Sequence, residues 1–337
     1  MSACGTVGYY AHVTRGQMSL LAHREPIATI IADPNADAEL RKRLAETQDA
    51  RKFASDRLGL PRNRSYTSYV ELHRPYVTWN VFAAPELSVD PVTHCFPSAG
   101  CVAYLGFFDK ARAERESAKL AKEGNDTAIE GAAAYSTLGW FADPVLSSML
   151  RWSDDELDGV IFHELAHQLV YVKDDTAFNE SYATFVQEEG LREWRAARGL
   201  PAVDTKRSEE DAFTALVLDL RERLKAVYSQ AIGDDAKRAA KRNEIERFRE
   251  RYREVRDRDW AGNAGYDRWV DAPINNARLL PFGLYDRWVP AFSRIFAEAG
   301  GDWTAFYEHV RVLAKLEKAE RERQLESLTN APAPPSH

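Results

Sequence analysis

The chain has 337 residues and a formal net charge of −7, with 45 Lys and Arg residues against 52 Asp and Glu residues. Hydrophobic residues make up 45% and charged residues 29%, which is typical of globular proteins and excludes a mostly disordered chain. The acidic balance argues against a broad basic surface for nucleic acid. No run of about 18 apolar residues predicts a membrane-spanning helix.

The N-terminus carries a short signal-like motif. Small residues before Cys4 and a glycine after it match the end of a bacterial lipoprotein signal peptide. No charged and apolar segment precedes the motif, so the alternative is an ordinary cysteine in a frayed terminus. We expect residues 1–36 to form an N-terminal segment, and a lipid on Cys4 would tether the chain to a membrane.

The next part of the chain alternates between helical and extended patterns. Apolar residues at helical spacing predict a helix over 37–59. Alternating β-branched and aromatic residues predict strands within 64–84, and 101–108 is another strand candidate. A charged helix is expected over 109–123, and small residues at 131–136 predict the start of a further strand.

Two cysteines bracket a short loop. Pro97 and Gly100 lie between Cys95 and Cys101 and favour a tight turn, which would bring the two sulfur atoms together. A disulfide there would suit an oxidising compartment, whereas two reduced thiols would suit a cytosolic protein. Together with Cys4, the pair favours the periplasmic side of a bacterial cell envelope.

The middle of the chain is predicted to be helical. Helices are expected over 155–172 and 177–198. A charge-rich pair follows over about 208–231 and 234–259, with Gly233 at the corner of a helical hairpin. A solvated structural hairpin is the simpler interpretation of this pattern, and an arm that binds a partner is the alternative.

The last part of the chain adds more helices. Residues 284–298 and 303–326 are predicted helices, and the proline-containing tail 331–337 is expected to be disordered or a linker. Taken with the earlier elements, the pattern predicts an α+β fold that is mostly helical, with a small sheet and a long helical hairpin. We expect residues 37–330 to form one domain.

The segment HELAH, from His163 to His167, is the strongest chemical signal. Residues four apart share one face of a helix, so His163 and His167 present both imidazoles to one point. Two neutral nitrogens suit one tetrahedral zinc ion, and Glu164 lies at its flank, where a bound water would sit. A chance match in an ordinary helix is the alternative, expected in on the order of one chain in a hundred.

Catalytic zinc usually takes three protein ligands, so a third is needed. Glu180 follows His167 beyond a polar turn, and a second helix folded back across the first would bring its carboxylate to the histidines. Asp174 and Asp175 in the turn are competing ligands. An exposed Glu that only favours the helix N-terminus is the remaining alternative. We expect one zinc ion per chain.

These zinc motifs resemble those of gluzincin metallopeptidases, the thermolysin-like class with a Glu as the third ligand. The resemblance rests on HExxH at 163–167 and on the segment NESYA at 179–183. It implies a zincin-like core, with His163, His167 and Glu180 as ligands. One position departs from the class: an Asp normally follows the ligand Glu by four residues, and here that residue is Thr184.

A wider set of motifs resembles a bacterial family of aminopeptidases whose members often carry lipoprotein signals. It comprises the cysteine loop 95–101, the segment YSTLGW at 135–140 and the segment NNA at 275–277, together with the zinc motifs. The resemblance covers roughly residues 4–310. It implies hydrolysis of peptides by an envelope enzyme.

The resemblance also implies a mechanism. Glu164 would accept the proton of a zinc-activated water and pass it to the leaving amine. A second group must stabilise the oxyanion. Tyr285 is the first candidate for this role, with core packing as the alternative.

Substrate contacts are harder to assign. A peptide backbone usually pairs with an exposed strand edge near such a metal, and 134–140 is the candidate edge, with Ser136 and Thr137 as substrate-binding residues. An interior strand would have the same pattern. Asn275 and Asn276 would bind the substrate backbone or cap a turn.

No residue explains a preference for free N-termini. Residues 134–140 contain no acid to bind an α-amine, and Glu130 and Asp143 only flank the segment. An aminopeptidase is therefore expected from the resemblance alone, and an endopeptidase is the alternative within the class. A non-catalytic, zinc-containing scaffold lipoprotein is the alternative outside it. Glu164 favours the enzyme, because a structural zinc site needs no base.

Overall fold

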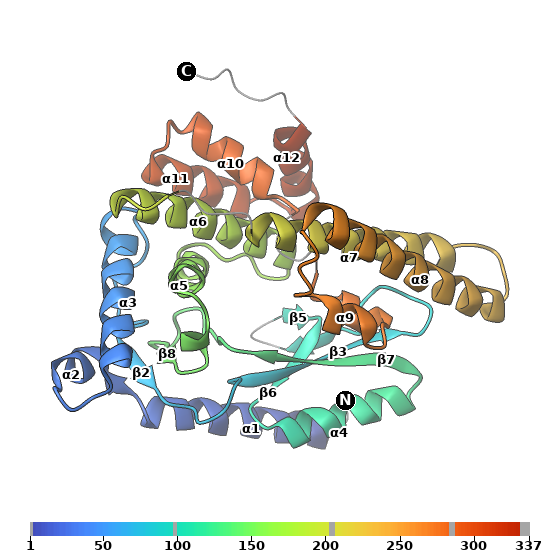
Figure 1. Cartoon of the computed structure of the whole chain (residues 1–337), viewed down its shortest axis with the longest axis horizontal. Helices are drawn as coiled ribbons and strands as arrows, with labels where there is room; N and C mark the ends of the chain where they lie inside the picture. Colours follow the sequence, from blue (N-terminus) through green and yellow to red (C-terminus); the bar gives the residue numbers. More distant parts are fainter. Residues whose placement is uncertain (1–2, 97–99, 202–205, 283–286, 331–337) are drawn as a thin grey trace. The chain divides into compact units, whose positions relative to one another are not determined.

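The computed structural model describes residues 3–96, 100–201, 206–282 and 287–330 (Figure 1). It confirms the mostly helical α+β fold with a small amount of sheet. The chain divides into two compact units, each built from separate stretches of sequence. The first unit comprises Met1–Thr78, Gly131–Ala202 and Leu284–His337, and the second comprises Trp79–Glu130 and Val203–Gly283. Among the described helices, none is both long and apolar enough to cross a membrane.

The first unit consists of helices and one small sheet. Its helices are α1 (Ala3–Ala22), α2 (Ile27–Ala32), α3 (Ala38–Asp56), α5 (Asp154–Leu169), α6 (Thr176–Ala197), α10 (Val289–Glu298), α11 (Trp303–Ala314) and α12 (Lys318–Asn330), with a 3-10 turn at Met149–Arg151. In the sheet, β2 (Ser68–Val70) pairs with β1 (Glu25–Pro26) in antiparallel fashion and with β8 (Val145–Leu146) in parallel fashion.

Helix α6 lies at the centre of the first unit, between α5 and the C-terminal helices (Figure 1). Its aromatic residues pack toward the C-terminal helices: the ring of Tyr182 lies 5.8 Å from that of Phe292, and the ring of Phe185 lies 5.1 Å from that of Phe306. Tyr182 is fully buried. This packing holds α6 in one rotation about its axis, with its other face toward α5.

A glycine allows α5 and α6 to approach closely. A Cβ atom added at Gly190 of α6 would lie 2.7 Å from Leu58 Cδ1 and 3.1 Å from Phe162 Cδ2, too close for any larger residue without a shift. Ala166 and Ala183, which are small residues on the same two helices, are also fully buried. Short side chains therefore line the contact between α5 and α6. Longer side chains of the two helices extend past this contact.

The second unit combines a three-stranded sheet, a two-stranded hairpin and a helical hairpin. Its elements are β3 (Thr78–Pro85), β4 (His94–Phe96), β5 (Gly100–Val102), β6 (Tyr104–Phe107), α4 (Lys110–Lys122), β7 (Asn125–Ala132), α7 (Lys206–Tyr228), α8 (Asp234–Asp259), α9 (Asp267–Asp271) and the 3-10 turn Asn276–Leu279. The sheet has the order β6-β3-β7, and β4 pairs with β5.

The charge-rich helical hairpin is present as α7 and α8, and Gly233 is the N-cap of α8. One face of it is buried. Phe213 and Leu220 of α7 pack with Phe248 and Tyr252 of α8 in one hydrophobic cluster. The hairpin therefore supplies the core of the second unit in addition to a charged outer face.

Three segments differ from expectation. The strand expected from residue 131 is β7, which ends at Ala132, so 134–140 is not part of a strand. The helix expected over 303–326 is divided into α11 and α12. The N-terminal segment contains α1 and α2.

Candidate metal-binding and catalytic site

The turn between α5 and α6 is held by side chains of α6. Asp175 caps α6 by accepting a hydrogen bond from the backbone N–H of Phe178. The amide of Asn179 accepts from the N–H of Val172 and donates to its carbonyl, each over 2.7 Å. Asp174 adopts a left-handed conformation with φ 61°. These contacts reverse the chain and return α6 across α5.

His163, His167 and Glu180 meet as a result. Nε2 of His163 lies 3.1 Å from Nε2 of His167 and 3.2 Å from Oε2 of Glu180, and Nε2 of His167 lies 3.6 Å from the same oxygen. Ligand atoms about 2.0–2.1 Å from a tetrahedral zinc ion are separated by roughly 3.3–3.4 Å. The donor set and its spacing therefore fit one such ion.

Glu180 and His167 shift each other's pKa. Burial would raise the pKa of Glu180, but the hydrogen bonds with His163 and His167 outweigh burial and lower the pKa to about 2. Burial would likewise lower the pKa of His167, and the contact with Glu180 outweighs it and raises the pKa. Glu180 is therefore an anion at neutral pH, as a metal ligand must be.

The outer partner of His163 is an amide. Nδ1 of His163 lies 3.1 Å from Oε1 of Gln187, a carbonyl oxygen that can only accept. This acceptor favours a proton on Nδ1, so that Nε2 would offer its lone pair to an ion that replaced the hydrogen bond with Glu180. Gln187 lies two helical turns after Glu180 on the same face of α6.

The second histidine, His167, has one ring nitrogen that is buried and one that faces the other candidate ligands. Among the residues that the structure describes, Nδ1 of His167 has no hydrogen-bond partner, although the atom is buried. Its Nε2 faces two acceptors, the Nε2 of His163 and the carboxylate of Glu180. An ion bound at this point would take one lone pair from each of the three side chains.

The candidate base, Glu164, follows His163 on the same helix, and its negative charge helps to raise the pKa of His167. Glu164 is half-buried on α5. Burial raises the pKa of Tyr66 well above its usual value, and the negative charges of Glu164 and Asp143 add to this effect, while a hydrogen bond with Ser136 opposes it. Tyr66, Asp143 and Ser136 are thus neighbours in the region next to Glu164.

A family model described as "Putative aminopeptidase" matches residues 8–325. The chain belongs to this family. The matched range includes all three candidate ligands and Glu164. Searches among curated proteins and among solved structures give no match. Membership of this aminopeptidase family supports a peptidase.

The segment 134–140, which was expected to form a strand edge for the substrate, is a loop. The backbone N–H and the hydroxyl of Thr137 both donate to the carboxylate of Asp143, over 2.9 and 2.8 Å. Burial raises the pKa of Asp143 to about 6, although these hydrogen bonds oppose the shift. The prediction of a strand is wrong here, because these side-chain contacts turn the backbone back on itself. Ser136 likewise accepts a hydrogen bond within the loop, from the N–H of Leu138.

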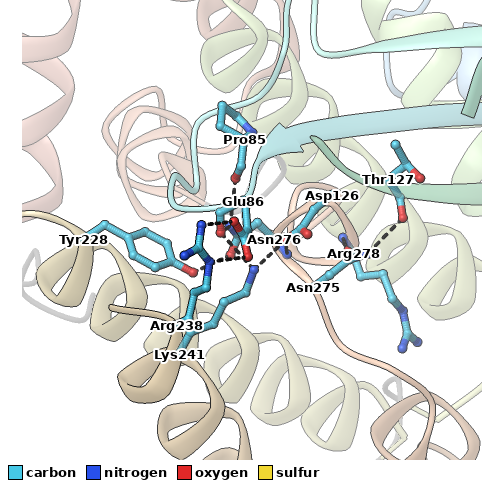
Figure 2. Close-up of polar contacts among 10 residues, drawn as sticks. All are labelled: Pro85, Glu86, Asp126, Thr127, Tyr228, Arg238, Lys241, Asn275, Asn276 and Arg278. Carbon is cyan, nitrogen blue, oxygen red and sulfur yellow. Dashed lines mark hydrogen bonds and ion pairs between the residues drawn. The ribbon is translucent and has the colours of Figure 1, made fainter. Parts of the chain in front are cut away.

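Asn275 and Asn276 have structural roles in the second unit (Figure 2). Asn276 is fully buried; its amide donates to the carbonyls of Pro85 and Glu86 and accepts from the hydroxyl of Tyr228. Asn275 donates to a backbone carbonyl of β7 and caps the following 3-10 turn. The buried amide of Asn276 is used internally, which argues against a contact with substrate.

Three predictions that involve cysteine or tyrosine remain. Cys95 and Cys101 are joined in a disulfide across β4 and β5. Cys4 lies in α1, among residues whose side chains the structure does not describe. Tyr285 falls outside the described residues.

Of the competing ligands, Asp175 is engaged as the cap of α6 and in a buried ion pair with Arg321.

Proposed function

We propose that the chain is a zinc-dependent peptidase, and specifically an aminopeptidase as its family description states. The observation that carries the proposal is the convergence of His163, His167 and Glu180, with their ligand atoms 3.1–3.6 Å apart. Glu164 directly follows the first of these residues on α5. A bound zinc ion would polarise the scissile carbonyl and acidify the attacking water.

The chain's own residues would complete the chemistry. Glu164 would accept the proton of the attacking water and deliver it to the leaving amine. Glu180 would contribute the negative charge of the ligand set. Gln187 would keep the Nδ1 of His163 protonated, so that Nε2 remains free to bind the ion.

We also propose that the enzyme works on the oxidising side of a bacterial cell envelope. The disulfide between Cys95 and Cys101 supports this location, because thiols in the cytosol are kept reduced. Lipid attachment at Cys4 would add a membrane tether. Mass spectrometry of the exported protein would detect both modifications.

The deciding experiment pairs metal analysis with hydrolysis. Zinc-loaded wild type and Glu164→Gln are assayed for metal content and for digestion of a peptide library with product masses recorded. We expect one zinc ion per chain in both proteins, and hydrolysis reduced about 10²–10⁴-fold in the variant. Glu308→Gln, an exposed Glu on α11, is the matched control and should behave as wild type.

Three outcomes would contradict parts of this proposal. Unchanged hydrolysis in Glu164→Gln would remove Glu164 as the base. Wild-type protein that binds no zinc, or binds it equally well after His163→Ala, would remove the metal site. Cleavage of the library peptides only at internal peptide bonds would show that the enzyme is an endopeptidase.

A further inference from the structure

A rigid loop presents two aromatic side chains near the candidate ligands. We call residues 136–141 the aromatic loop. Its sequence ends in Trp140 and Phe141, which have 82% and 45% of their surface exposed. Trp140 is far more exposed than is usual for so large an apolar side chain. Exposed apolar surface of this kind typically marks a place where something binds.

The backbone of the loop is fixed from inside. The Thr137 side chain accepts a hydrogen bond from the N–H of Phe141, and its backbone and hydroxyl are anchored on the buried carboxylate of Asp143. Leu138 has φ 54°, a left-handed conformation that is strained for a branched residue. A loop held this way keeps its exposed side chains in place, which lowers the entropy lost on binding.

The loop lies against the helix that carries both histidines. A Cβ atom added at Gly139 would come within 3.1 Å of the side chain of Gln168, the residue that follows His167. Gln168 is itself held by the side chain of Asn63, over 2.7 Å. The backbone that leads into Trp140 and Phe141 therefore lies next to α5, close to the residue that follows His167.

The chemistry of the segment selects one kind of occupant. Residues 131–142 contain no charged side chain. Aromatic faces bind apolar and aromatic groups through burial and stacking, whereas a carboxylate would lose its bound water there. The nearby guanidinium of Arg24 already donates to the carbonyl of Ala142. The occupant must also reach the cluster of His163, His167 and Glu180, as a peptide bound for cleavage would.

We propose that Trp140 and Phe141 receive an apolar side chain of the peptide substrate, next to the bond that is cleaved. The protein would therefore prefer peptides with Leu or Phe at that position over peptides with Asp. This inference rests on the proposed peptidase function and names its substrate class.

The test uses hydrolysis and binding separately. A set of short peptides that differ only at the residues on either side of the cleaved bond (Phe, Leu, Ala or Asp) is assayed with zinc-loaded wild type, Trp140→Ala and Trp140→Phe. We expect wild type to favour Phe and Leu over Asp by about tenfold or more in kcat/KM. Trp140→Ala should lose most of that preference through a higher KM, and Trp140→Phe should retain much of it.

Binding of the same peptides to zinc-loaded Glu164→Gln, with and without Trp140→Ala, is measured by calorimetry. Val312→Ala is the matched control, because Val312 is an exposed apolar residue on α11 with 59% of its surface accessible. Equal preference and equal affinity with and without Trp140 would overturn the inference and leave the peptidase intact. Binding of Phe and Leu peptides that depends on Trp140, with no cleavage by wild type, would overturn the peptidase and leave apolar recognition standing.

Discussion

The guanidinium of Arg321 donates two hydrogen bonds to Oδ2 of Asp175, over 2.9 and 2.6 Å, and both side chains are only 3% exposed. The other oxygen of Asp175 caps α6. One carboxylate thus joins α12 to the first turn of the helix that carries Glu180. The position of a candidate ligand depends on a residue close to the C-terminal end of the described chain.

Breaking this pair should be costly. Arg321→Met would leave the buried charge of Asp175 uncompensated and should lower the free energy of unfolding by about 3–5 kcal/mol. Urea denaturation measures the change. Arg323→Met, which removes an exposed pair with Glu320, should cost less than about 1 kcal/mol. Equal effects of the two substitutions would contradict a special role for Arg321.

Gln187 should tune metal affinity. Gln187→Leu removes the acceptor for Nδ1 of His163 and should weaken zinc binding about 10–100-fold, since the ring loses its preferred proton position. Competition with a chromophoric chelator measures the affinity. Gln187→Glu keeps an acceptor at that point and should bind zinc more tightly than Gln187→Leu. Identical affinities in all three proteins would show that this hydrogen bond does not orient the histidine.

Asp158 should make stability depend on pH. It is 2% exposed on α5 and accepts a hydrogen bond from the indole of Trp194 over 2.8 Å. Burial raises its pKa to about 7. Between its ordinary value near 4 and that pKa, the folded state holds a proton that the unfolded state releases. Stability should therefore fall as pH rises through this window.

Asp158→Asn keeps the acceptor and cannot ionise, so it should be more stable than wild type at pH 8 by on the order of a few kcal/mol and equally stable near pH 4. Thermal unfolding of both proteins at several pH values gives the difference directly. A difference that does not change with pH would show that Asp158 does not titrate in this range.

The amide of Asn276 should matter for stability and not for substrate. Asn276→Ala would remove the hydrogen bonds of a fully buried amide to the Tyr228 hydroxyl and to the carbonyls of Pro85 and Glu86, and should cost about 3 kcal/mol. Tyr228→Phe removes one of these hydrogen bonds and should cost about 1 kcal/mol. The KM for a peptide should be unchanged in folded Asn276→Ala protein. A large rise in KM would instead indicate that Asn276 contacts the substrate.

Local spacing explains how much of the site could be predicted. His163 and His167 are four residues apart on one helix, so periodicity alone places them together, and Glu180 needed only a turn between two predictable helices. The long helices α3, α4, α5 and α6 and the helical hairpin follow from the same periodicity. These features depend on contacts close in sequence.

The missed features depend on side-chain contacts that have no fixed spacing. Gln187 is uncharged, and an amide seven residues after a ligand is not a recognised motif. The aromatic loop has the composition of a strand, and its path is set by the bond between Thr137 and Asp143 and by a left-handed Leu138, which few leucines adopt.

The division into two units affects how the protein is made. The first unit is assembled from three separate stretches of sequence and the second from two. Neither unit corresponds to a continuous gene fragment, so neither can be expressed alone by simple truncation. During synthesis, the stretch with His163 and Glu180 leaves the ribosome well before Arg321, so the candidate metal site can be braced only after α12 has been made.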